Sequence, residues 1–130
     1  MEYKIRKIKE EEIVELHRFL YLAIYVHKGE TPPPFDIIYK PELQVYVDNL
    51  GKEKDDHILV AEAENRIVGA VWVRIMDDYG HIDDDTPSLI ISVEKEYRGK
   101  GIGSSLLSAM LSLLSDLGYK SVSLSCQKEN

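Results

Sequence analysis

The sequence predicts an α/β (α+β) protein in a single domain, residues 1–130, with elements in the order β, α, α, β, β, β, α, β. Two β-rich runs, "HILVAEAE" and "IVGAVWVRIMD", are separated by a short turn at Asn65 and Arg66, which indicates a hairpin. Two other segments, residues 10–26 and 103–118, carry apolar side chains at helical spacing. A chain of this length can bury a substantial core without metal ions or crosslinks. We assign no metal-binding residues.

The first part of the chain contributes a strand and two helices before the hairpin. Residues 3–8 alternate apolar and basic side chains, as short edge strands do, and acidic residues begin the helical pattern that follows. Three prolines exclude a helix through residues 27–36, which we expect to be extended or turning. Pro41 suits the first turn of a helix, so a second short helix is predicted from there to Gly51.

The last part of the chain contributes two more strands around a long helix. Residues 88–93, "SLIISV", form a predicted strand after an acidic loop, and Gly118 closes the helix that follows. Residues 120–126 alternate apolar side chains with serines, which predicts a strand that is covered on one face only.

The charge of the chain limits the kinds of partner it can bind, and its cysteine content indicates the compartment in which it folds. The chain carries 23 acidic and 16 basic side chains and a formal net charge of −7, which argues against a surface for nucleic acid or anionic membranes. We therefore expect neutral or cationic partners. Cys126 alone cannot form an internal disulfide, and the polar start "MEYKIRKIKEEE" has no signal-peptide core, so a cytoplasmic location is predicted. The apolar runs are too short for a membrane span.

Three glycines in "RGKGIGS", residues 98–104, indicate a phosphate site before the long helix. The first turn of a helix presents unpaired backbone N–H groups and the positive end of the helix dipole. Gly99, Gly101 and Gly103 remove the Cβ atoms that would hold a pyrophosphate away, and the two basic residues of the run add positive charge. A structural turn needs about one glycine, so we prefer the ligand interpretation.

The spacing of these glycines excludes two common nucleotide motifs. A dinucleotide fingerprint, G-x-G-x-x-G, would need a glycine at Ser104 or Leu106. A P-loop would need a glycine, four residues and then Gly-Lys-Ser/Thr, which does not occur in this sequence. Chemistry on ATP or GTP is therefore not expected.

The run "ISVEKEYRGKGIGSSLL" resembles the strand, loop and helix at the centre of the GNAT superfamily of acyl-CoA N-acyltransferases. The signature of that family is Gln/Arg-x-x-Gly-x-Gly/Ala, and Arg98, Gly101 and Gly103 fill these positions. Residues 89–130 match position by position, and the rest of the chain matches in the order of its elements. The resemblance implies a mixed, mostly antiparallel central sheet flanked by helices. It also implies an N-acetyltransferase that moves an acetyl group from acetyl-CoA to a primary amine of an unidentified acceptor by direct attack.

The same resemblance implies roles for individual residues. Backbone N–H groups of residues 99–104 would bind the pyrophosphate of coenzyme A, and the backbone of residues 91–93 would pair with the pantetheine arm. The N–H group of Val93 would then stabilise the oxyanion of the thioester. The implied cofactor-binding residues are Ile91, Ser92, Val93, Arg98, Gly99, Lys100, Gly101, Ile102, Gly103, Ser104 and Asn130, the last as the family's asparagine.

The sequence leaves the general base open between a histidine and a run of acids. His81 and five nearby aspartates flank the strand that leads to the cofactor, although such a run is also typical of a solvated loop. Glu94 and Glu96 adjoin the signature, and we expect no catalytic role for either. We interpret the other histidines as structural or exposed, and Cys126 as a buried thiol. The aspartates are Asp77, Asp78, Asp83, Asp84 and Asp85, and the other histidines are His17, His27 and His57.

Aromatic residues are concentrated in the segment where the family builds its acceptor pocket. They would line a substrate site there, although packing in the core is an equally good interpretation of each one. These residues are Tyr21, Tyr25, Phe35 and Tyr39.

The resemblance implies a C-terminally shortened member of the family. In the family a helix with a tyrosine and two further strands commonly follow, whereas this sequence ends at Asn130. The general acid is therefore unassigned. The strand at residues 120–126 would have an open edge, so we expect a homodimer formed through that strand or the adjoining helix. Two alternatives to an active enzyme stay open: a non-catalytic acyl-CoA-binding module and an inactive, shortened dimer.

Overall fold

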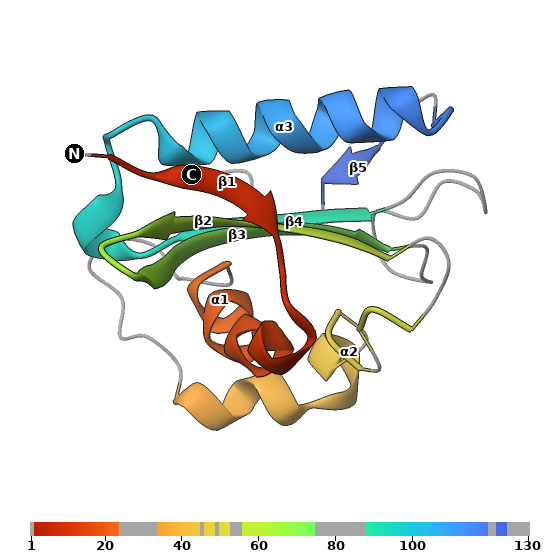
Figure 1. The fold of residues 1–130 in the computed structure, drawn as a ribbon. Helices are drawn as coiled ribbons and strands as arrows, with labels where there is room; N and C mark the ends of the chain where they lie inside the picture. Colours follow the sequence, from red (N-terminus) through yellow and green to blue (C-terminus); the bar gives the residue numbers. More distant parts are fainter. Residues whose placement is uncertain are drawn as a thin grey trace.

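The structure, a computed structural model, is built around a five-stranded sheet in the order β1-β2-β3-β4-β5 (Figure 1). It describes residues 2–23, 34–44, 46–48, 50–52, 56–74, 88–119 and 122–124. Strands β1 to β4 pair antiparallel with their neighbours, and β5 pairs parallel with β4, so the predicted mixed, mostly antiparallel sheet is confirmed. The strands are β1 (Lys4–Lys7), β2 (His57–Ala63), β3 (Arg66–Arg74), β4 (Ser88–Val93) and β5 (Ser123–Leu124).

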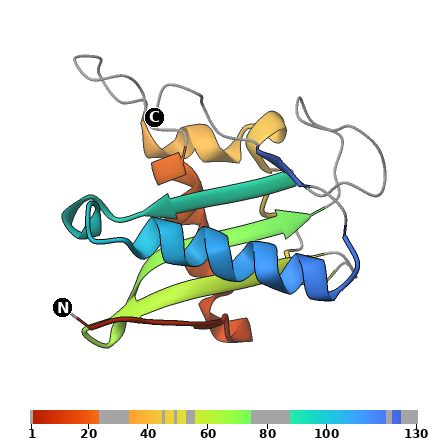
Figure 2. The same ribbon diagram turned by 90° about the horizontal axis from the view of Figure 1, so that it is seen from above.

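Helices cover both faces of the sheet. α3 (Ile102–Asp116) lies along one face and α1 (Leu16–Ala23) crosses the other, as Figures 1 and 2 show. The shorter helical segments are η1 (Glu10–Glu15), η2 (Phe35–Tyr39), α2 (Pro41–Gln44) and η3 (Lys95–Tyr97), where η marks a 3₁₀ helix. Within the described part of the chain, every helix is too short or too polar to cross a membrane.

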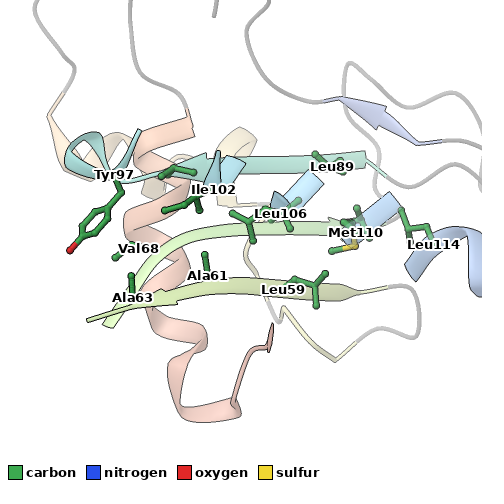
Figure 3. Close-up of a cluster of buried hydrophobic side chains, with 13 residues drawn as sticks. Leu59, Ala61, Ala63, Val68, Leu89, Tyr97, Ile102, Leu106, Met110 and Leu114 are labelled. Atoms are coloured by element: carbon green, nitrogen blue, oxygen red, sulfur yellow. The ribbon is translucent and has the colours of Figure 1, made fainter. Parts of the chain in front are cut away.

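Within the described residues, the hydrophobic core forms two clusters, one on each face of the sheet. Successive strand residues point to opposite faces, so Leu59 and Ala61 contact the α3 side whereas Ile58 and Val60 contact the α1 side. On α3, the buried residues recur every four positions and face the strands (Figure 3). These residues are Ile102, Leu106, Met110 and Leu114.

The two predicted N-terminal helices differ from the structure in type and length. The first begins as the 3₁₀ segment η1 and becomes an α-helix only at Leu16, and positions 24–26 of its predicted range lie outside the described residues. The second ends at Gln44 rather than near Gly51. Beyond this end, side chains of β3 bind backbone carbonyls within the predicted range: Trp72 Nε1 donates to the carbonyl of Tyr46 at 2.9 Å and Arg74 donates to the carbonyl of Asp48 at 2.8 Å.

The predicted hairpin and the end of α3 are confirmed, with a small shift in the turn. Glu64 and Asn65, rather than Asn65 and Arg66, form the turn between β2 and β3. Both have positive φ angles, 54° and 65°, as a two-residue type I′ turn requires. After α3, Gly118 adopts a φ of +94° and its N–H donates to the carbonyl of Ser115, which ends the helix where the sequence predicted.

Arg6 joins β1, η1 and β2 through two carboxylates. Its guanidinium donates to Glu12 at 2.8 and 2.9 Å and to Glu62 at 2.7 Å. The hydrogen bond from Arg6 lowers the pKa of Glu12 from 4.5 to about 2, and Arg6 lowers the pKa of Glu62 as well. Because the folded state holds Glu12 in its charged form, this contact stabilises the fold above pH 4.5 and is lost as the pH falls toward 2.

We therefore expect the free energy of unfolding to fall between pH 5 and pH 3, and to fall less in a Glu12→Gln variant. Urea unfolding of both proteins at the two pH values measures the difference. Glu11→Gln, the same change at the neighbouring exposed position, is the control and should keep the pH dependence of the original protein. Identical pH dependence in Glu12→Gln and the original protein would contradict the assignment to Glu12.

Candidate functional site

The end of β4 presents backbone groups away from the rest of the sheet. Glu94 N–H donates to the carbonyl of Val68 at 2.8 Å, and Val93 lies opposite Gly69 in the next position of the ladder. Since hydrogen-bonded and non-hydrogen-bonded pairs alternate in an antiparallel ladder, the N–H groups of Val93 and Ile91 point away from β3. They point toward the edge at which β5 pairs with β4.

That edge is paired with β5 only at the start of β4, as far as the described residues extend. The register joins Ser88 to Ser123 and Leu89 to Leu124. Further along, Ile91 presents its N–H and carbonyl groups, and Val93 its N–H group, in the way that an edge strand presents them to an added strand. The edge therefore fits the backbone pairing that the family resemblance implies for these two residues.

Ser92, the third predicted residue of this strand, has a different environment. By the same alternation its backbone faces β3. Its side chain is buried, and its hydroxyl donates to the carbonyl of Phe19 in α1 at 2.7 Å. Ser92 therefore attaches β4 to α1, while its neighbours carry the outward-facing groups.

The glycine turn that follows β4 is open at its surface. Gly99 and Gly101 have φ angles of +78° and +86°, and a Cβ atom added to either would meet no described atom of the protein within 4 Å. Gly101 is the N-cap of α3 and has no side chain that could cap the first N–H groups of the helix. The first N–H groups of α3, at Ile102 and the two residues after it, have no carbonyl acceptor within the helix. An anion can therefore approach these groups across bare backbone.

Close packing places this turn beside Val93. A Cβ atom on Gly69 would lie 3.0 Å from the Leu106 side chain of α3 and 3.2 Å from the Val93 side chain, so a larger residue there would have to displace these side chains. A Cβ atom on Gly103 would lie 3.8 Å from the Val93 side chain. The first turn of α3 and the end of β4 are thus direct neighbours.

The two basic residues of the turn are exposed, but one of them also has a structural contact. Arg98 Nε donates to the carbonyl of Val93 at 2.9 Å, and this bond connects the end of the strand to the start of the turn. The rest of the Arg98 guanidinium remains at the surface together with Lys100. Positive charge is therefore present where the sequence predicted a phosphate.

Glu94 has a role that the sequence did not reveal. Its side chain is only 6% exposed and forms ion pairs with Arg66 of β3, at 2.6 Å, and with Arg18 of α1. These three residues line a cavity of about 740 Å³ together with Lys95 and Leu22. Nothing in the local pattern around Glu94 signals these contacts, because the two arginines are 28 and 76 residues away in sequence.

Several predicted residues lie outside the described part of the chain. The candidate bases are all among them, so their assignment stays a prediction. The residues concerned are Asp77, Asp78, His81, Asp83, Asp84 and Asp85, with Tyr25, His27, Cys126 and Asn130.

The described histidines and the predicted pocket aromatics each have a ring contact. The ring of His17 stacks on Tyr39 at 6.1 Å, and the ring of Tyr21 lies 5.2 Å from Phe35. Phe35 and Tyr39 are 45% and 59% exposed, so neither is a core residue. His57 packs edge-on against the ring of Tyr119 at 6.0 Å, in agreement with a structural role.

Solved structures share this fold over nearly the whole chain. An N-acetyltransferase from Staphylococcus aureus superposes with a TM-score of 0.70 at 20% identity, covering 100% of this chain and 76% of that one. The PaiA N-acetyltransferase from Thermoplasma acidophilum, solved in complex with coenzyme A, superposes with a TM-score of 0.68 at 19% identity, covering 100% and 82%. A GNAT family acetyltransferase from Streptococcus pneumoniae gives 0.66 at 19% identity, covering 99% and 77%.

The sequence comparison gives the family directly. No curated protein is similar enough to this sequence to count as a match. The sequence model of the acetyltransferase (GNAT) family, in contrast, matches residues 13–130, which include α1, the whole of β2 to β5 and the glycine turn. Because this match extends over most of the sequence, the chain belongs to the GNAT family of acetyltransferases, which transfer acyl groups from coenzyme A thioesters.

Proposed function

We propose that this protein transfers an acetyl group from acetyl-CoA to a primary amine of a small molecule or a protein. One observation carries the proposal: an open, positively charged glycine turn at the start of α3 lies beside the outward-facing N–H group of Val93. The similar fold of the Thermoplasma protein, which was solved with coenzyme A, supports the same choice of co-substrate.

In the proposed reaction, a neutral amine attacks the thioester carbonyl carbon. A C–N bond forms, the C–S bond breaks, and coenzyme A leaves as a thiolate. The turn and the first N–H groups of α3 hold the pyrophosphate, and Ile91 pairs with the pantetheine arm as a neighbouring strand would. The N–H group of Val93 donates to the carbonyl oxygen as negative charge develops on it. The amine loses its proton to a base, for which His81 and the aspartates nearby in sequence are the proposed candidates.

We expect the purified protein to release free coenzyme A from acetyl-CoA when a suitable amine is supplied. Thiol release can be followed with a chromogenic reagent across a panel of di- and polyamines, aminoglycosides and lysine-containing peptides. A Gly101→Glu variant measured in parallel corrects for uncatalysed hydrolysis. Saturable binding of acetyl-CoA without thiol release on any amine would contradict the enzyme and favour a non-catalytic acyl-CoA-binding module.

A further inference from the structure

Tyr3, a residue near the start of the chain, contacts the glycine turn. Its hydroxyl oxygen lies 2.7 Å from Ser105 Oγ and 3.4 Å from the carbonyl oxygen of Gly101. Its ring packs, partly buried, against the core cluster on the α3 side. Figure 1 shows the N-terminal end of β1 next to the start of α3, so the two segments meet although about a hundred residues separate them.

The Tyr3 hydroxyl can form both contacts at once, by accepting one hydrogen bond and donating another. The Ser105 hydroxyl can donate to the Tyr3 oxygen, which leaves the proton of Tyr3 to be donated to the carbonyl of Gly101. The same carbonyl accepts the backbone N–H of Ser105 at 3.0 Å. The Gly101 carbonyl therefore has two donors, the Ser105 N–H within the helix and, at a longer distance, the hydroxyl of Tyr3, which precedes β1.

We propose that Tyr3 is a positioning residue for the cofactor turn, an inference that rests on the function proposed above. The carbonyl of Gly101 and the N–H of Ile102 belong to one planar peptide group and point in opposite directions. A contact that fixes the carbonyl therefore fixes the direction of this N–H group, the first that α3 offers to a pyrophosphate. Tyr3 acts on the ligand through the peptide group and does not touch it.

Within the described part of the chain, the backbone of the glycine turn has few other contacts that would fix its conformation. No described atom packs within 4 Å of the Cβ positions of Gly99 and Gly101, and glycine restricts its own backbone less than any other residue. Arg98 fixes the entry to the turn through the carbonyl of Val93, and Tyr3 fixes its exit through the carbonyl of Gly101. Both ends are thus arranged before a ligand arrives, which reduces the conformational entropy lost on binding.

The test compares coenzyme A affinity in Tyr3→Phe and the original protein by calorimetry. Tyr3→Phe keeps the packed ring and removes the hydroxyl, so we expect the Kd to rise about three- to tenfold, the loss of one hydrogen bond. The KM for acetyl-CoA should rise by the same factor, with kcat unchanged at saturation. Ser105→Ala, which removes the other hydroxyl of the pair, should also raise the Kd. It replaces Tyr3→Phe in the test if Tyr3→Phe does not fold.

Ser108→Ala is the matched control, because it makes the same change at an exposed position one turn further along α3. Its Kd should equal that of the original protein. If the original protein binds coenzyme A while Tyr3→Phe and Ser105→Ala bind within twofold as tightly, the positioning role is wrong and Tyr3 only supports the fold. If the original protein does not bind coenzyme A, the proposed function is wrong and this inference falls with it.

Discussion

Replacing Gly101 by glutamate is expected to weaken coenzyme A binding by more than about a hundredfold, or about 3 kcal/mol. Gly101 has a φ of +86°, and the position of its missing Cβ is open. A side chain there would enter the space of the pyrophosphate, and its carboxylate would compete for the same N–H groups of α3 and repel the phosphates. Calorimetric titration of the variant with coenzyme A measures the loss.

Gly118→Glu is the matched control for this change. Gly118 also has a positive φ, +94°, and an open Cβ position, but it lies at the other end of α3. In both variants the new side chain sits on a residue with left-handed backbone, which is strained. Both variants should therefore be less stable than the original protein, to a similar degree. Only Gly101→Glu should lose binding. Unchanged affinity in Gly101→Glu, or an equal loss in Gly118→Glu, would contradict the cofactor assignment.

Replacing Glu94 by glutamine is expected to lower the free energy of unfolding by about 1 to 3 kcal/mol. Removing one partner of a fully buried ion pair costs about 3 to 5 kcal/mol. Here the side chains of Arg18 and Arg66 are 36% and 50% exposed, so water partly solvates the charges that are left, and the loss is smaller. Urea unfolding at pH 7 measures it.

Glu96→Gln makes the same change two residues further on, at an exposed position. It should alter the free energy of unfolding by less than about 0.5 kcal/mol. Equal stability of Glu94→Gln and Glu96→Gln would show that the ion pairs of Glu94 do not hold α1 and β3 to the end of β4.

The sequence predicted the elements whose signals are local and continuous. The runs that became β2, β3 and β4 are β-rich throughout, and the apolar spacing of α3 continues to Gly118. The glycine turn was equally visible, because its positive φ angles and exposed helix terminus are properties of a few adjacent residues. Local pattern therefore predicted the part of the candidate site that we propose for coenzyme A.

Contacts between distant residues could not be predicted in this way. The hydroxyl of Ser92 donates to the carbonyl of Phe19, which is 73 residues away, and Trp72 donates to the carbonyl of Tyr46, which is 26 residues away. The link from Tyr3 to Ser105 spans 102 residues. Self-association through residues 120–126 stays a prediction, because most of that strand lies outside the described residues.

The central claim, that the glycine turn beside Val93 binds coenzyme A, is tested most directly by a titration of the ¹⁵N-labelled protein followed by NMR. We expect saturable shifts that are largest for the amide groups of Ile102, Gly103, Ser104 and Val93. Residues at the opposite end of α3 line a separate cavity of about 480 Å³ with Lys52 and His57, and their amides should shift little. Shifts concentrated around that cavity, or no saturable shifts at all, would contradict the account.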